Sequence, residues 1–168
     1  MKKTSTIVLT MARRLNASTN DVFKAWTKPE LMKKWLFTTE ATNEVARNEF
    51  RVGGVWEIVD RRDGEEYRAT GEYVEIDAPH KIGFTFEMPQ FNDLQDHIIV
   101  WVSAVGDACE MTFKQEIVVP HEEDWSEEDL ETAMKEFSGQ SEDGWDRMFE
   151  GLKELVETGE VRAGDAIE

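Results

Sequence analysis

The chain has 168 residues, of which 40% are hydrophobic and 33% are charged. This length and composition are typical of one compact domain with its own core, and they argue against a disordered chain. The 36 Asp and Glu residues outnumber the 19 Lys and Arg residues, which gives a net charge of -17. Because such a charge repels phosphate backbones and anionic lipid headgroups, we expect neither nucleic acid nor a membrane as a partner.

The cysteine content and the N-terminal sequence indicate in which cellular compartment the protein resides. Cys109 is the one cysteine of the sequence, so no internal disulfide can form and a cysteine-rich zinc site is excluded. The first residues lack the long apolar run and the small-residue cleavage site of a signal peptide. No window approaches the roughly 18 apolar residues of a membrane span. We therefore expect a cytoplasmic protein.

The first part of the chain predicts a strand followed by two short helices. Residues 6–15 alternate between apolar and polar side chains, as a strand does. Ser18 stands three residues before Asp21, in a weak form of the capping box that begins a helix. Pro29 suits the first turn of a second helix and cannot lie inside the first. The two helices are therefore expected to meet in a bend at Pro29.

The middle of the chain predicts an antiparallel meander. Turn signals such as Gly53-Gly54 separate runs with strand patterns. Gly71 and Gly83 fall inside these runs, where glycine marks a bend or a bulge. With the first strand, seven strands are expected to form a strongly curved sheet. The six further candidate strands cover residues 44–52, 55–61, 66–76, 81–87, 97–105 and 108–118.

The C-terminal part predicts an acidic excursion and then a long helix. Residues 119–140 contain the acidic run HEEDWSEEDLE and are expected to be exposed, with a short helix from Ser126. Ser141 then caps a helix whose apolar residues recur at three- and four-residue intervals until Gly159. This helix is long enough to lie across the concave sheet. We expect a single domain at residues 1–158 and a frayed tail at 159–168.

The sequence contains no motif for a metal, a nucleotide or a catalytic centre. The three histidines are scattered and lack the spacing of metal ligands. Cys109 alternates with Met111 and Phe113, which places its thiol on an inward strand face. Gly53-Gly54 lacks the following helix of a phosphate-binding loop. We therefore expect no cofactor, no metal and no catalytic residue.

The inward face of the predicted sheet is apolar and aromatic. Every second side chain of a strand faces the same side of the sheet, so one set in each strand is expected to lie on the concave side. The C-terminal helix adds its own apolar stripe. Such a lining suits either a filled core or an apolar pocket, and the pattern does not separate the two. The expected ligand-binding residues, with Trp35 and Tyr73 at the rim, are Trp35, Trp56, Ile58, Tyr73, Phe84, Phe86, Val100, Val102, Met111, Phe113, Gln115, Trp145, Met148, Phe149 and Leu152.

Five segments, taken in order, resemble a known family. They read RLNASTNDVFKAWTKPELMKKWL, FRVGGVWEI, GEYVEIDAPHKIGFTFE, VGDACEMTFKQE and GWDRMFEGLKELVE. Together they resemble the activator-of-Hsp90-ATPase-like branch of the START/Bet v 1 superfamily over residues 6–156. The resemblance implies an α+β helix-grip fold. In that fold a curved seven-stranded antiparallel sheet surrounds a long C-terminal helix, and two short helices lie between strands one and two.

The resemblance also implies an apolar cavity between the sheet and the long helix. Relatives bind lipids, hormones or polyketides there, and some catalyse reactions in the cavity. After Trp35 this sequence has Leu36, Phe37 and Thr38, where many relatives have a second aromatic residue followed by Gly-Pro. This departure bears on the shape of the cavity mouth, which need not be the same as in those relatives.

Three functional hypotheses remain. The leading one is non-enzymatic binding of a small apolar or aromatic molecule by a monomer or weak homodimer. The second is a chaperone-linked interaction module, in which the acidic segment around Trp125 binds a basic surface of an Hsp90-type chaperone. The third is an enzyme that cyclises or hydrolyses a bound substrate, with Gln115 and Tyr73 as its candidate polar groups.

Overall fold

The structure is a computed structural model that describes residues 2–91 and 94–161. Its elements follow the order expected from the sequence. The chain begins with β1 (Lys2–Leu15), α1 (Thr19–Thr27) and α2 (Pro29–Met32). It continues through β2 (Asn43–Asn48), β3 (Val55–Arg62), β4 (Glu65–Asp77), β5 (Lys81–Phe86), β6 (Asp96–Val105) and β7 (Ala108–Glu122), and ends with α3 (Glu127–Thr158).

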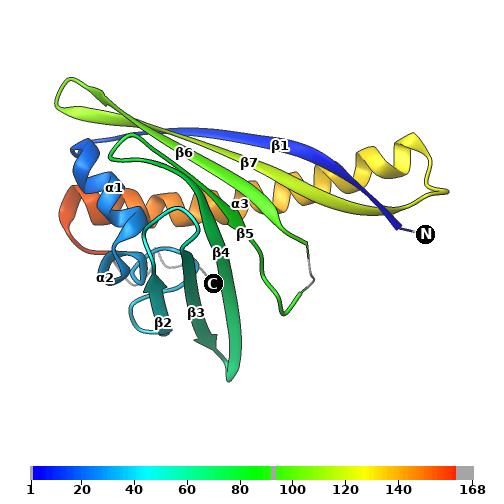
Figure 1. The fold of residues 1–168 in the computed structure, drawn as a ribbon, viewed down its shortest axis with the longest axis horizontal. Coiled ribbons are helices and arrows are strands. Elements are labelled where there is room, and N and C mark those ends of the chain that lie inside the picture. Colours follow the sequence, from blue (N-terminus) through cyan, green and yellow to red (C-terminus); the bar gives the residue numbers. More distant parts are fainter. Residues whose placement is uncertain (1, 92–93, 162–168) are drawn as a thin grey trace.

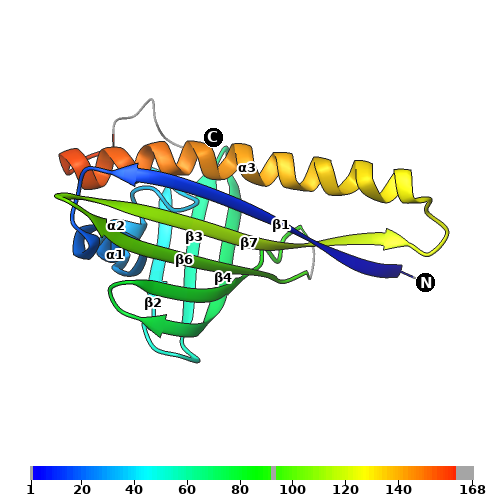
Figure 2. The same cartoon turned by 90° about the horizontal axis from the view of Figure 1, so that it is seen from above.

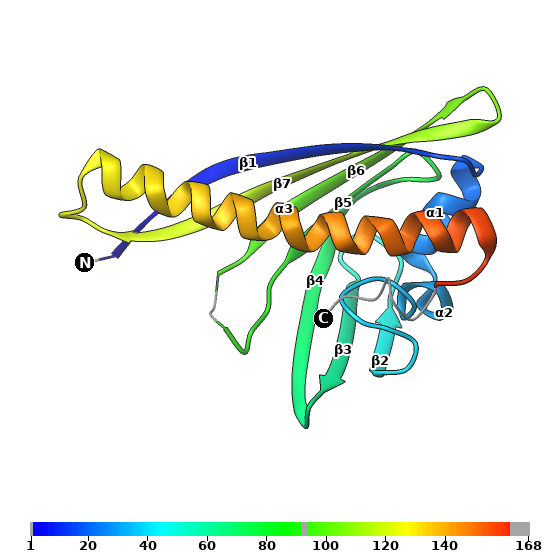
Figure 3. The same ribbon diagram turned by 180° about the vertical axis from the view of Figure 1, so that it is seen from behind.

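Within the described residues, the seven strands form one antiparallel sheet in the order β1-β7-β6-β5-β4-β3-β2. Each strand pairs with its neighbour in sequence, except that β1 pairs with β7 (Figure 1). The β1–β7 pair runs beside α3 for much of the helix (Figure 2). Seen from behind, α3 crosses one face of the sheet (Figure 3). The α+β helix-grip fold expected from the resemblance is confirmed.

Three strand ends differ from the expectation by more than one residue. β1 begins at Lys2 and β7 continues to Glu122, because the ladder between them extends to the pair Lys2↔Glu122. β2 ends at Asn48 rather than at 52, since the chain then enters the turn that contains Gly53-Gly54. The expected tail at 159–168 lies mostly outside the described residues, which end at 161.

The expected boundary between an acidic excursion and a helix from Ser141 is wrong. α3 is one continuous helix, and it starts with a capping box in which Ser126 and Asp129 exchange side-chain-to-backbone hydrogen bonds. The acidic residues of the first turn stabilise this end, where unpaired N–H groups carry partial positive charge. Partly buried Met134 and Phe137 pack against the core and continue its apolar stripe.

The expected bend at Gly71 is present in β4. β4 pairs with β3 through residue 72 and with β5 from Tyr73 onward, so the sheet bends between the two ladders. A Cβ atom at Gly71 would lie 1.7 Å from the Thr85 carbonyl oxygen and 2.6 Å from Trp56 Nε1. Trp56 Nε1 donates a hydrogen bond to the same oxygen at 3.2 Å. Only glycine allows this approach of backbone and indole.

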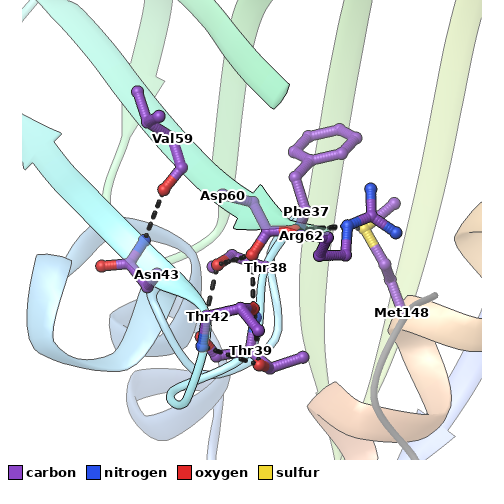
Figure 4. Close-up of polar contacts among 9 residues, drawn as sticks. All are labelled: Phe37, Thr38, Thr39, Thr42, Asn43, Val59, Asp60, Arg62 and Met148. Carbon is purple, nitrogen blue, oxygen red and sulfur yellow. Dashed lines mark hydrogen bonds and ion pairs between the residues drawn. The ribbon is translucent and has the colours of Figure 1, made fainter. Parts of the chain in front are cut away.

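A buried carboxylate holds the segment between α2 and β2. Asp60 is fully buried, and its Oδ1 accepts hydrogen bonds from the hydroxyls of Thr38, at 2.8 Å, and Thr42 (Figure 4). Arg62 Nε lies 2.6 Å from Asp60 Oδ2 as an ion pair, although neither of these atoms makes a hydrogen bond. This Asp60 cluster fixes the segment that carries Phe37, whose φ of 59° is uncommon for an aromatic residue.

The apolar core lies between the sheet, α1 and α3. It contains Cys109, which is fully buried as expected, and burial raises the pKa of its thiol. Trp26 donates its indole N–H to Met111 Sδ, and Trp35 donates to the Ala25 carbonyl oxygen at 2.8 Å. Among the described helices, none is long and apolar enough to cross a membrane.

Replacing Gly71 with Ala is expected to lower the free energy of unfolding by roughly 1 to 3 kcal/mol, because the methyl group must displace Thr85 or Trp56. Gly139 in α3 is the matched control, since a Cβ atom there meets no atom within 4 Å. Gly139→Ala is expected to raise stability by up to about 1 kcal/mol through helix propensity. Urea unfolding measures both changes, and equal midpoints would contradict the role of Gly71.

Replacing Asp60 with Ala is expected to lower the free energy of unfolding by about 2 to 4 kcal/mol, because Thr38 and Arg62 lose a buried partner. Glu44→Ala is the control, since it removes the exposed carboxylate that pairs with Arg61, and little change is expected. Thermal unfolding followed by circular dichroism compares the two variants. Similar losses in both would argue against a structural role for the buried carboxylate.

Candidate ligand-binding site

An open pocket lies between the sheet and the middle of α3. Its volume is about 360 Å³, which falls in the range of small-molecule sites, about 300–1,000 Å³. Three strands contribute to its walls: β5 with its end, β6 with its start and β7 with its C-terminal half. The other walls come from the middle of α3 and from the segments that follow α2 and β5. The lining residues are Phe37, Phe86, Glu87, Met88, Phe91, Leu94, Asp96, Gln115, Ile117, Val118, Phe137, Gln140, Ser141, Gly144, Trp145 and Met148.

Aromatic rings form one wall of this pocket. The Phe37 ring stacks on Phe86, with 5.0 Å between centroids and an interplanar angle of 11°, and it meets Trp145 edge to face at 5.1 Å. The Phe37 backbone N–H also donates to Met148 Sδ at 3.2 Å. Phe37 therefore joins β5 to α3 across the pocket. Its position depends on the Asp60 cluster behind it (Figure 4).

Three polar side chains are connected at the same site. Trp145 Nε1 donates to Gln115 Oε1 at 3.1 Å, and Gln115 Nε2 donates to Asp96 Oδ2 at 2.8 Å. The Val118 backbone N–H donates to Asp96 Oδ1 at 2.9 Å. Burial raises the pKa of Asp96, and the hydrogen bonds from Val118 and Gln115 oppose this shift. Each Asp96 oxygen thus accepts an N–H group, which is an arrangement suited to an ionised carboxylate.

The structure brings four of the expected ligand-binding residues to this pocket. Phe86, Gln115, Trp145 and Met148 all line it. Gln115 and Trp145 are 1% and 2% exposed, so each shows only a small part of its surface to the opening. Their assignment as binding residues stays a prediction.

The remaining expected residues lie in the core beside the pocket. Trp35 and Tyr73, expected at the rim, are each only 2% exposed. Trp56, Tyr73 and Phe84 border a separate void of about 10 Å³, which is close to the space that one water needs. The others are packed among core side chains, and they are Trp35, Ile58, Val100, Val102, Met111, Phe113, Phe149 and Leu152.

Sequence reasoning missed several lining residues. Asp96 has the same strand parity as Ile98 and Val100, but the predicted strand began one residue after it. The sequence marks Phe37 only as part of a departure from the pattern of relatives. Phe137 was assigned to an exposed segment, because α3 was expected to begin later. The parity of β6 could have identified Asp96 and the apolar spacing of α3 could have identified Phe137, whereas neither signal applies to Phe37.

The two candidate polar groups of the enzyme hypothesis, Gln115 and Tyr73, are not free to contact a substrate in the pocket through unpaired polar atoms. The amide of Gln115 is engaged at both ends, by Trp145 and by Asp96. Tyr73 does not line the pocket, and burial raises the pKa of its hydroxyl far above the ordinary range. Across residues 2–91 and 94–161, no group of three or more His, Cys, Asp or Glu side chains could hold a metal ion.

Solved structures from several bacteria share this fold. A Staphylococcus aureus protein of unknown function is 24% identical with a TM-score of 0.85, and the alignment covers 94% of this chain and 97% of that one. A Nitrosomonas europaea protein is 18% identical with a TM-score of 0.70, covering 91% of this chain and 96% of that one. A Chromobacterium violaceum protein is 18% identical with a TM-score of 0.67, covering 89% and 96%.

Sequence comparison identifies the family. No curated protein matches the chain significantly. The family described as "Activator of Hsp90 ATPase homolog 1-like protein" matches residues 16–157, which include α1, α2, β2 to β7 and nearly all of α3. This match agrees with the resemblance of the five sequence segments. The chain therefore belongs to the Activator of Hsp90 ATPase homolog 1-like family, within the START/Bet v 1 superfamily.

Proposed function

We propose that this protein binds a small apolar or aromatic molecule in the pocket between the sheet and α3. The observation that carries the proposal is an open space of about 360 Å³ with mostly apolar walls. Transfer of an apolar molecule from water into such a space is favourable. A site of this size accepts a molecule of two or three fused or linked rings, or a short alkyl chain.

The rigidity of the walls supports this proposal. Phe37 is held by the Asp60 cluster behind it and by stacking on Phe86. A void in the neighbouring core measures about 10 Å³, and the side chains around it are buried, so this part of the wall rests on closely packed side chains. A preformed pocket avoids the entropy cost of ordering side chains when a ligand binds.

We further propose binding without chemical conversion, as a monomer or weak homodimer in the cytoplasm. The engagement of Gln115 at both ends of its amide supports a structural and positioning role for this residue. The single domain expected at residues 1–158 fits one binding site per chain.

Gly144 and Gly139 offer a matched test, because both lie in α3 and a Cβ atom at either position meets nothing within 4 Å. Only Gly144 lines the pocket. Gly144→Leu is expected to fill the space and weaken binding of naphthalene by about tenfold or more, which corresponds to about 1.4 kcal/mol. Gly139→Leu is expected to bind like the wild type. Titration calorimetry measures the affinities.

The same experiment can refute the proposed function. The proposed function is wrong if the wild-type protein binds neither naphthalene nor biphenyl at their solubility limits. Equal weakening in Gly144→Leu and Gly139→Leu would move binding away from this pocket. Circular dichroism of both variants shows whether α3 remains folded.

A chaperone-linked interaction is the second candidate, and two observations favour it. The family description names an activator of the Hsp90 ATPase. Trp125 is 39% exposed beside the acidic residues Glu123 and Asp124, and its ring lies 6.0 Å from that of His121. An exposed tryptophan flanked by carboxylates suits docking to a basic surface.

Capture of a purified Hsp90-type chaperone by immobilised wild-type protein is expected at low salt and is expected to weaken as salt screens the charges. Trp125→Ala is expected to reduce capture several-fold, whereas Phe91→Ala, which removes another exposed aromatic residue, should not. Capture that is absent, or that is insensitive to both salt and Trp125→Ala, would count against this candidate.

A further inference from the structure

We propose that the pocket selects apolar molecules that carry one hydrogen-bond donor, with a cationic amine preferred, and that it rejects carboxylates of the same shape. This inference rests on the proposed function and names its ligand class. The selecting group is Asp96, at the start of β6, whose carboxylate lines the pocket.

The orientation of Asp96 is set by a directed chain of hydrogen bonds. An indole N–H can only donate, so Trp145 requires the Gln115 amide to present its oxygen. The Gln115 nitrogen then faces Asp96 and donates to Oδ2, while the Val118 N–H donates to Oδ1. Two donors on two oxygens stabilise the ionised form of Asp96. The carboxylate is therefore a fixed acceptor rather than a mobile surface group.

Asp96 retains capacity for a ligand. An ionised carboxylate offers about four lone-pair sites, and the hydrogen bonds from Gln115 and Val118 use two of them. Phe86 lies directly opposite Asp96 in the β5–β6 ladder and also lines the pocket. An ammonium group placed here would lie beside a carboxylate, which attracts cations, and next to an aromatic side chain. The apolar body of the ligand would lie along Phe37 and Trp145.

The charges around the pocket favour the same selection. Glu87 and Asp96 are the charged residues among the described lining residues, and none of these residues is Lys, Arg or His. The whole chain carries a net charge of -17. A carboxylate ligand would place a like charge beside Asp96 in a partly desolvated site, with no cation in the described lining to balance it. Free fatty acids and aromatic acids are thus expected to bind poorly.

A series of ligands with one body and three head groups tests this selection. The probes are naphthaleneethylamine, naphthaleneethanol and naphthaleneacetic acid at neutral pH, with naphthalene as the reference that has no head group. Wild-type protein is expected to bind the amine about ten- to hundredfold more tightly than the acid, with the alcohol between them, as a hydrogen bond to a charged group predicts. The affinities are measured by titration calorimetry at 0.15 M salt, which screens the long-range electrostatic field of the protein's net charge.

Two substitutions separate the local effect of Asp96 from the effect of the protein's overall negative charge. Asp96→Asn is expected to lower amine affinity about tenfold or more and to reduce discrimination between the amine and the acid, because it removes the negative charge and one of the two acceptor oxygens. Glu116→Gln is the matched control, because Glu116 lies on β7, pairs with His97 and does not line the pocket. It removes the same charge and is expected to leave discrimination unchanged.

Each outcome has one meaning. Naphthalene that binds with no preference among the head groups would overturn this inference and leave the proposed function standing. Discrimination that falls equally in Asp96→Asn and Glu116→Gln would assign it to overall charge and overturn the role of Asp96. If Asp96→Asn loses naphthalene binding as well, the wild-type ranking of the three head groups decides the inference. No binding of any probe would overturn the proposed function itself.

Discussion

The position of Trp145 between α3 and the sheet is the constraint on which the rest of the site depends. Its ring packs on Phe113 of β7 at 4.5 Å between centroids, on Phe149 at 5.4 Å and on Trp26 of α1 at 6.0 Å. Its indole N–H also requires an acceptor, which Gln115 supplies. One side chain thereby joins the long helix to the sheet and to α1. It is both part of the core and part of the pocket wall.

The pocket lies where this packing ends. On the core side of Trp145 the rings of α1, β7 and α3 fill the space, whereas on the pocket side α3 carries the small residues Ser141 and Gly144 between Phe137 and Met148. Phe37 covers part of this opening because the Asp60 cluster holds its segment in place. The opening is therefore a preformed feature of the fold. The polar chain from Trp145 through Gln115 ends at Asp96, so the wall at the start of β6 carries a hydrogen-bond acceptor whose orientation is fixed by its partners.

Much of the fold could be predicted from local signals. The helix break at Pro29 follows from the missing N–H group of proline, and the cap at Ser18 follows from the unpaired N–H groups of a first turn. Strand alternation placed Met111 and Phe113 correctly inside the sheet. A short helix was expected from Ser126, but its continuation past Ser141 as one long helix could not be predicted in this way. Its first half is acidic and polar, and only contact with the core stabilises the stripe that contains Phe137.

The sequence by itself determined which side chains face inward, because strand and helix periods depend on backbone geometry alone. It did not determine which of these side chains border empty space. Phe84 and Phe86 share one face of β5, yet Phe84 is 4% exposed in the core and Phe86 lines the pocket. That difference depends on where α3 and the segment carrying Phe37 lie relative to the sheet. Tertiary packing alone decides it, because a cavity is a property of the surfaces that surround it and not of any one strand.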